Sequence, residues 1–136
     1  MIDKELKKFV KESLKEDIKS GDHTSLACID AKNNSSAILL SKDNGIIAGI
    51  ELANYIFNEV DSKLNIKSNF RDGNTVKKGD IIMNISGNTQ SILKAERLVL
   101  NCMQQMSAIA TKTNNISKKI SSTNTKILDT RKTIPL

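Results

Sequence analysis

The stretch NTQSILKAERLVLNCMQQMSAIATKTNNISKKI, residues 88–120, largely determines the fold that we expect. Neither proline nor glycine interrupts it, and its apolar residues recur every three or four positions, which is the period of an α-helix. Asn88 or Thr89 is suited to cap the N-terminus of this helix. The periodic positions are Ile92, Ala95, Val99, Met103, Met106, Ala110, Thr113, Ile116 and Ile120. We therefore predict one long helix whose apolar stripe, methionines included, packs in a core.

A second face of the same helix is mostly polar. It carries one charge, two amides and small side chains, at Arg97, Asn101, Gln104, Ala108 and Thr111. Such a face can meet a ligand or another subunit, and exposed faces of this kind also occur without any function. Periodicity makes Arg97 a candidate binding residue, but it does not decide between a binding face and an exposed face without function.

The segments before this helix alternate between helical and strand patterns. Residues 2–18 have apolar residues at helical spacing and predict an amphipathic helix that Gly21 ends. The polar SGDHTS, residues 20–25, then leads to SSAILLSK, residues 35–42. Asn44-Gly45 separates that strand from IIAGI, residues 46–50, which is the usual signal of a tight β-hairpin.

The middle of the chain predicts a second helix and more β structure. Ala53, Ile56, Phe57 and Val60 have helical spacing, whereas residues 64–70 alternate as on a half-buried strand. RDGNTVKKGDIIMNISGN, residues 71–88, contains two short β segments with glycines at tight corners. The expected class is therefore α+β.

The end of the chain combines a strand pattern with positive charge. KILDT, residues 126–130, predicts a strand, and Arg131 and Lys132 follow at its carboxyl end. That position is where α/β barrels and open α/β sheets hold ligands, although a solvated basic terminus explains the pattern equally well. Most of the formal charge of +6 lies in residues 112–136. Because this stretch has no aromatic residue for base stacking, we expect no nucleic acid, and a small anionic ligand suits the charge as well.

Other classes of site are poorly supported. One histidine, His23, and two cysteines cannot form a closed zinc site, so we expect no metal held by this chain. We expect Cys28 and Cys102 to be small buried apolar residues. The apolar runs are far shorter than the ~20 residues of a membrane span, and no apolar signal core begins the chain. We expect a cytoplasmic protein without a membrane contact.

Five segments together resemble the quinolinate phosphoribosyltransferase family. In chain order they are EDIKSGDHTS (16–25), DNGIIAGIE (43–51), DGNTVKKGDIIMNISG (72–87), KAERLVLNCMQQMSAIAT (94–111) and ILDTRKTIP (127–135). The resemblance spans essentially the whole chain. It implies transfer of a phosphoribosyl group from phosphoribosyl pyrophosphate to quinolinate with loss of carbon dioxide, which gives nicotinate mononucleotide and pyrophosphate for NAD synthesis. Mg²⁺ would accompany the pyrophosphate.

The resemblance also implies roles for four residues. Arg97 and Arg131 match the family's substrate-carboxylate arginines, because a guanidinium binds a carboxylate through two parallel hydrogen bonds. Lys132 matches the catalytic and substrate-binding basic residue beside the phosphoribosyl donor. Thr130 belongs to the same substrate-binding segment and offers backbone and hydroxyl hydrogen bonds.

The architecture implied by the resemblance is an N-terminal α/β sandwich, hammerhead-like, followed by an α/β barrel. We assign residues 1–112 to the sandwich and residues 113–136 to the end of the long helix and the first strand of a truncated barrel. A whole barrel takes ~250 residues, so we expect an inactive fragment with a loosely held tail, and the Mg²⁺ ligands in the missing barrel. Arg97 would act across the interface of a homodimer or higher homo-oligomer.

Two other functions fit parts of the pattern. A sister protein associated with molybdenum transport is similar in architecture and motifs. A biotinyl or lipoyl carrier module has a corner resembling residues 72–87. Carriers of that kind present a modified lysine, typically in a Met-Lys pair, and this sequence has no such pair.

Overall fold

The computed structural model of the protein describes residues 4–19 and 21–130. Its elements are α1 (Lys4–Ile18), α2 (His23–Cys28), β1 (Asn34–Leu40), β2 (Gly45–Ile46), α3 (Ile50–Val60), β3 (Asn65–Ser68), β4 (Thr75–Val76), β5 (Ile81–Asn88) and α4 (Thr89–Ile120). One antiparallel sheet has the strand order β1-β5-β3, and β2 pairs with β4 in a second, two-stranded sheet. This mixture of helices and sheet confirms the α+β class.

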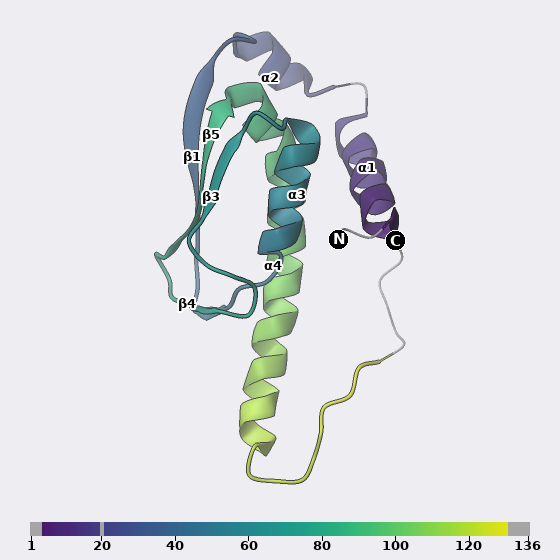
Figure 1. Ribbon diagram of the computed structural model, residues 1–136, viewed down its shortest axis with the longest axis vertical. Coiled ribbons are helices and arrows are strands. Elements are labelled where there is room, and N and C mark those ends of the chain that lie inside the picture. The colour runs from purple at the N-terminus through teal and green to yellow at the C-terminus, as the bar shows by residue number, and fades with distance from the viewer. Residues whose placement is uncertain (1–3, 20, 131–136) are drawn as a thin grey trace.

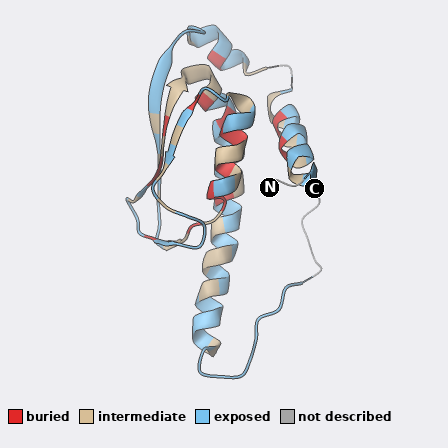
Figure 2. Ribbon diagram, viewed as in Figure 1, coloured by how far each residue is buried: buried red, intermediate tan, exposed pale blue. Residues whose placement is uncertain are grey.

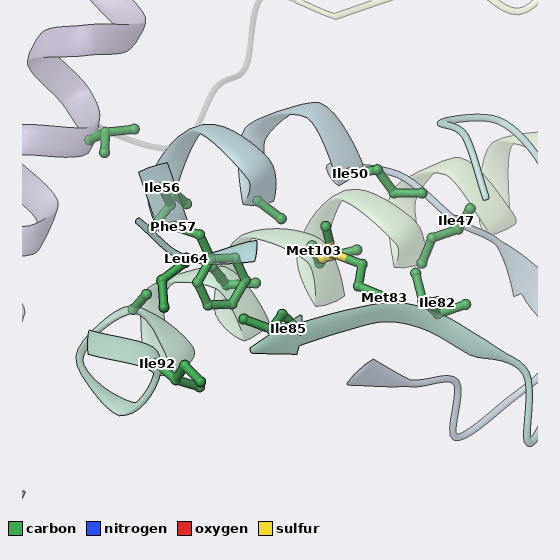
Figure 3. Packing of buried hydrophobic residues seen from close by; sticks show 14 of the residues in the cluster. Ile47, Ile50, Ile56, Phe57, Leu64, Ile82, Met83, Ile85, Ile92 and Met103 are labelled. Carbon is green, nitrogen blue, oxygen red and sulfur yellow. The ribbon is translucent and has the colours of Figure 1, made fainter. Parts of the chain in front are cut away.

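The elements form layers, as Figure 1 shows. The larger sheet lies on one side of α3 and α4, and α1 lies on the other side of these two helices. The core fills the space between sheet and helices, where Figure 3 shows Met83 beside Met103 and Phe57 beside Leu64. Val10 and Leu14 of α1 are buried as well, so the first helix is anchored to the same cluster.

Strand β5 lies in the middle of the larger sheet, and it carries more buried residues than any other described strand. Ile82 and Met83 are fully buried, and Ile85 is nearly so. Both neighbours pair with it at Ile85, Ala37 from β1 and Ile66 from β3. From Met83 to Ser86 the strand has a neighbour on each side, so its backbone groups there can pair in both directions, which suits its buried apolar residues.

The hairpin predicted at Asn44-Gly45 is wrong. Strand β1 pairs along its whole length with β5, and Gly45–Ile46 pairs instead with Thr75–Val76. The chain leaves β1 at Ser41, whose backbone bonds to Asp80 and Gly79, and the side chain of Asn44 accepts a hydrogen bond from Lys78 N. Long-range pairing with β5 buries more apolar surface than a local hairpin would, and this overrides the turn signal.

Two hydroxyl groups of α4 complete the hydrogen bonding of the β2 region. Thr111 Oγ1 accepts from Ile46 N at 2.9 Å, and Ser107 Oγ accepts from Ala48 N at 3.0 Å. Between them in the sequence, Ile47 donates its amide hydrogen to Asn74 O on the opposite side. A Cβ on Gly45 would lie 2.6 Å from Thr111 Oγ1, so glycine permits this close approach of helix and strand.

Helix α3 is capped by a residue outside it. Gly49, at the N-cap, has φ of 96° and no side chain to satisfy the first amides. Asp72 supplies the acceptors instead, since its Oδ1 and Oδ2 accept from Ile50 N at 2.8 Å and from Glu51 N at 3.2 Å. A carboxylate at a helix N-terminus also interacts favourably with the helix dipole.

We expect Asp72→Ala to destabilise the domain by about 1 kcal/mol, because two amides of α3 lose their acceptor. Urea unfolding of the 136-residue chain, followed by circular dichroism, measures this loss. Glu12→Ala is the control, since Glu12 is exposed and makes only a long ion pair, 3.8 Å, with Lys8. Equal unfolding midpoints for the two variants would show that Asp72 is not the cap.

The helices were largely predicted, with two corrections. Helix α1 was expected, but SGDHTS is not simply a loop: His23–Cys28 form a short helix whose N-cap Asp22 accepts from Ser25 N. The helix has only 6 residues, which is too short for a periodic pattern.

The two cysteines differ from their predicted burial. Cys28 is exposed in α2, so its predicted burial is wrong. Cys102 is half-buried, and burial raises the pKa of its thiol.

The long helix was predicted correctly in extent, with Asn88 as its N-cap. Its apolar stripe is buried from Ile92 to Met103, whereas Met106 and Ile116 are 40% and 44% exposed. Figures 1 and 2 show the reason for Ile116, because the last turns of α4, beyond the contacts of Ser107 and Thr111 with the β2 region, extend past the sheets and no other described element covers them. The core-packing prediction therefore holds only for the first half of the stripe. The helix continues without a break through residue 112, so the domain boundary placed there remains a prediction.

The strand predicted over residues 126–130 is not formed. These residues are exposed and irregular. A strand needs a neighbour for its backbone groups, and no strand of the described sheets pairs with them.

Candidate ligand-binding site around Arg97

Arg97 lies on the third turn of α4, and its side chain is 71% exposed. The guanidinium Nη1 donates to Asp17 Oδ1 at 2.6 Å. Asp17 belongs to the last turn of α1, and its side chain is only 22% exposed. The site therefore begins as a charge-assisted hydrogen bond between two helices whose residues are 80 positions apart.

A second carboxylate contributes to the field at Arg97. Asp22, the N-cap of α2, has a pKa below its usual value, chiefly because Ser25 donates hydrogen bonds to it from its hydroxyl and its backbone amide. Attraction to Arg97 lowers this pKa further, with a smaller contribution from His23. Two aspartates of the first motif segment, Asp17 and Asp22, thus interact with the arginine of the fourth.

The chemistry available at Arg97 is recognition of a carboxylate or a phosphate. A guanidinium offers five N–H donors in a planar fork, and the contact with Asp17 occupies one nitrogen. The side chain is mostly solvent-exposed, so the other donors are accessible to an anionic group. One edge of the fork can hold Asp17 while the other binds a ligand.

A depression of about 440 Å³ lies beside this pair, between α1 and α4. It is lined by Ser13, Glu16, Asp17, Lys19, Leu98 and Asn101. Because its lining combines two carboxylates with one lysine, it is not a dedicated anion pocket. Asp17 is where the depression adjoins Arg97.

The second helix face is open over most of its length but not throughout. Asn101, Gln104 and Ala108 are exposed, as predicted for a binding face. Thr111 is half-buried and bonded to the β2 region, so it is structural. Sequence reasoning missed Ser107, whose hydroxyl has the same role, because nothing in its local pattern indicates a bond to residue 48.

The other predicted site residues lie at the end of the chain. Thr130 is exposed in the irregular segment after α4, where its amide donates to Asp129 Oδ1 at 2.7 Å. Arg131 and Lys132 lie outside the described residues. Their roles therefore stay predictions.

Two further observations concern the described residues alone. They contain no group of three or more histidine, cysteine, aspartate or glutamate side chains that could hold a metal ion. None of their helices is both long enough and apolar enough to cross a membrane.

The fold and the site define an α+β domain that presents an outward-facing arginine from a long helix beside a short antiparallel sheet. Residues 22–107 match the family model of the quinolinate phosphoribosyl transferase N-terminal domain. The chain belongs to the quinolinate phosphoribosyltransferase family. The matched range includes residues 72–87, so their likeness to a carrier-domain corner requires no separate function.

Relatives and solved structures agree with this assignment. The chain is 44% identical over 132 residues to quinolinate phosphoribosyltransferase [decarboxylating] 2b, mitochondrial, of Nicotiana tabacum, covering 96% of this chain and 37% of that protein. It is 34% identical to the probable nicotinate-nucleotide pyrophosphorylase [carboxylating] of Bacillus subtilis, covering 96% of this chain and 45% of that protein.

Two solved structures show the same fold over nearly the whole chain. NadC from Streptococcus pyogenes has a TM-score of 0.93 at 29% identity, over 99% of this chain and 48% of its own. The nicotinate-nucleotide pyrophosphorylase from Francisella tularensis has a TM-score of 0.89 at 38% identity, over 96% of this chain and 46% of its own. The chain thus spans less than half the length of each of these proteins.

Proposed function

We propose that this chain is the N-terminal part of a carboxylating nicotinate-nucleotide pyrophosphorylase. The reaction transfers phosphoribosyl from phosphoribosyl pyrophosphate to quinolinate, releasing carbon dioxide and pyrophosphate and leaving nicotinate mononucleotide. The observation that carries the proposal is the exposed guanidinium of Arg97, already paired with one carboxylate, on the helix that matches the family. Quinolinate is a planar dicarboxylate, which is the kind of ligand a guanidinium fork recognises.

The residues of this chain would act by electrostatics. Arg97 would bind a carboxylate of quinolinate, together with Arg131. Thr130 and Lys132 would bind near the phosphoribosyl donor, where Lys132 is the proposed catalytic residue. Departure of pyrophosphate develops negative charge on the leaving group, and loss of carbon dioxide develops negative charge on the pyridine ring. Preorganised cations stabilise such negative charge more than water does.

The direction of Arg97 supports a role between subunits. Its side chain is 71% exposed, and the next residues on the same helix face, Asn101 and Gln104, are exposed as well. A residue that completes a neighbour's site must project outward in this way. We therefore propose a homodimer or higher homo-oligomer in which Arg97 crosses the interface.

Magnesium is proposed as a companion of the pyrophosphate group. The described residues gather no cluster of acidic or imidazole groups suited to hold it, so its ligands would come from elsewhere in the active enzyme. We also propose a cytoplasmic location for this protein. It would differ in this respect from the plant relatives, which are named as mitochondrial or chloroplastic.

A chimera tests this function. Residues 1–136 of this chain replace the segment of the Bacillus subtilis relative to which they align. We expect the purified chimera to convert quinolinate to nicotinate mononucleotide when phosphoribosyl pyrophosphate and Mg²⁺ are present, with no reaction of nicotinate. We expect no turnover from the 136-residue chain alone. A folded, oligomeric chimera that leaves quinolinate unchanged would refute the proposal.

A further inference from the structure

We propose that Asp17 is a positioning residue for Arg97: its carboxylate holds the guanidinium at the junction of α1 and α4, with the unoccupied donors directed outward to a ligand carboxylate. This inference rests on the ligand-binding role proposed for Arg97. It adds a residue from the first helix to the site, and α1 otherwise has only a packing role.

The geometry gives the pair unequal partners. Asp17 follows the buried Leu14 by one helical turn, and the adjacent Ile18 packs against the core, so its backbone is fixed. Its side chain is largely covered, whereas that of Arg97 is mostly exposed. A long exposed arginine samples many rotamers, and binding a ligand would require it to lose that freedom. The fixed carboxylate removes much of it beforehand.

The contact differs from the other ion pairs among the described residues. Lys8 and Glu12 are 3.8 Å apart, and Lys11 and Glu59 are 3.7 Å apart, and both distances are too long for a hydrogen bond. At 2.6 Å the pair between Asp17 and Arg97 is a true hydrogen bond between charged groups. The two long ion pairs contribute little to stability, whereas the short hydrogen bond from Arg97 to Asp17 can orient the arginine side chain.

Asp22 does not compete for this role. Both of its carboxylate oxygens accept from Ser25, one from the backbone amide and one from the hydroxyl. It therefore attracts Arg97 electrostatically, and within the described residues no hydrogen bond joins the two side chains. Asp17 is the direct partner, and it leaves one edge of the guanidinium fork available.

Steady-state kinetics of the chimera tests the inference. We expect Asp17→Ala to raise KM for quinolinate by roughly 3- to 10-fold, as a ligand contact loses preorganisation without being removed. The value of kcat and the KM for phosphoribosyl pyrophosphate should change less than twofold. Asp17→Asn keeps an acceptor oxygen and should restore most of the loss. Glu12→Ala, at an exposed acidic position of the same helix that does not line the depression, should have no effect.

The outcomes separate this inference from the proposed function. If Arg97→Lys raises KM for quinolinate and Asp17→Ala does not, Arg97 binds the ligand and Asp17 does not position it. A decrease in KM with Asp17→Ala would mean that Asp17 competes with the ligand, which also overturns the inference. If neither variant changes KM in an active chimera, the role proposed for Arg97 itself fails.

A measurement on the 136-residue chain applies even if the chimera is inactive. Nitrogen-15 NMR of the arginine side chains reports how fast each guanidinium rotates. We expect slow rotation for Arg97 in the unmodified chain and in Asp17→Asn, and fast rotation in Asp17→Ala. Identical rotation in all three would show that Asp17 does not hold Arg97.

Discussion

Replacing Arg97 with lysine in the chimera is expected to raise KM for quinolinate by roughly 10- to 100-fold, the loss typical of a charge-assisted, two-point contact. Lysine keeps the charge but offers a point ammonium in place of a planar fork, so it cannot bind a carboxylate at two points and hold Asp17 at the same time. Stability should change little, because the Arg97 side chain is 71% exposed.

The measurement is initial-rate kinetics with quinolinate varied at saturating phosphoribosyl pyrophosphate. Arg71→Lys is the matched control, since Arg71 is an exposed arginine outside the Arg97 site. Thermal unfolding of both variants shows whether each is folded. An unchanged KM in a folded Arg97→Lys chimera would remove this residue from the binding site.

Replacing Ile56 with alanine is expected to have the largest effect on stability. Ile56 has no exposed surface and lies on α3 within the core cluster. Removing buried methylenes loses their transfer free energy and leaves a cavity, which together destabilise by about 2–5 kcal/mol. A loss of that size is a large fraction of the stability of a domain this small.

Urea unfolding of the 136-residue chain measures this effect. Ile109→Ala is the matched control, because Ile109 lies on a helix but is 63% exposed. That substitution should shift the unfolding free energy by less than about 0.5 kcal/mol, as is usual for surface positions. Similar losses in both variants would mean that α3 does not pack as described.

The helices could be predicted because their information is local. The extent of α4, its N-cap and the burial of its first half all follow from residues three and four positions apart. Only α2 escaped prediction, since six residues are too few to show a period. The burial of the second half of the stripe was wrongly expected, because periodicity says which side is apolar and not where the sheet stops.

The strands could be predicted individually but not in their pairing. The segments that became β1, β3 and β5 all have alternating or apolar patterns, yet the local turn signal at Asn44-Gly45 suggested the wrong partner. Pairing depends on which strands bury the most surface together, and β1 and β5 are separated by about forty residues of chain. No pattern within either strand specifies the other.

By itself, the sequence determined the three longer helices α1, α3 and α4, the α+β class and the outward face that carries Arg97, since each depends on the spacing of neighbouring residues. The five motif segments, in their order, determined the family. Only the tertiary structure decided that β5 is central, that Asp72 caps α3 and that Asp17 meets Arg97. These are contacts between side chains or strands far apart along the chain, and only the packing of the whole domain around its core brings them together.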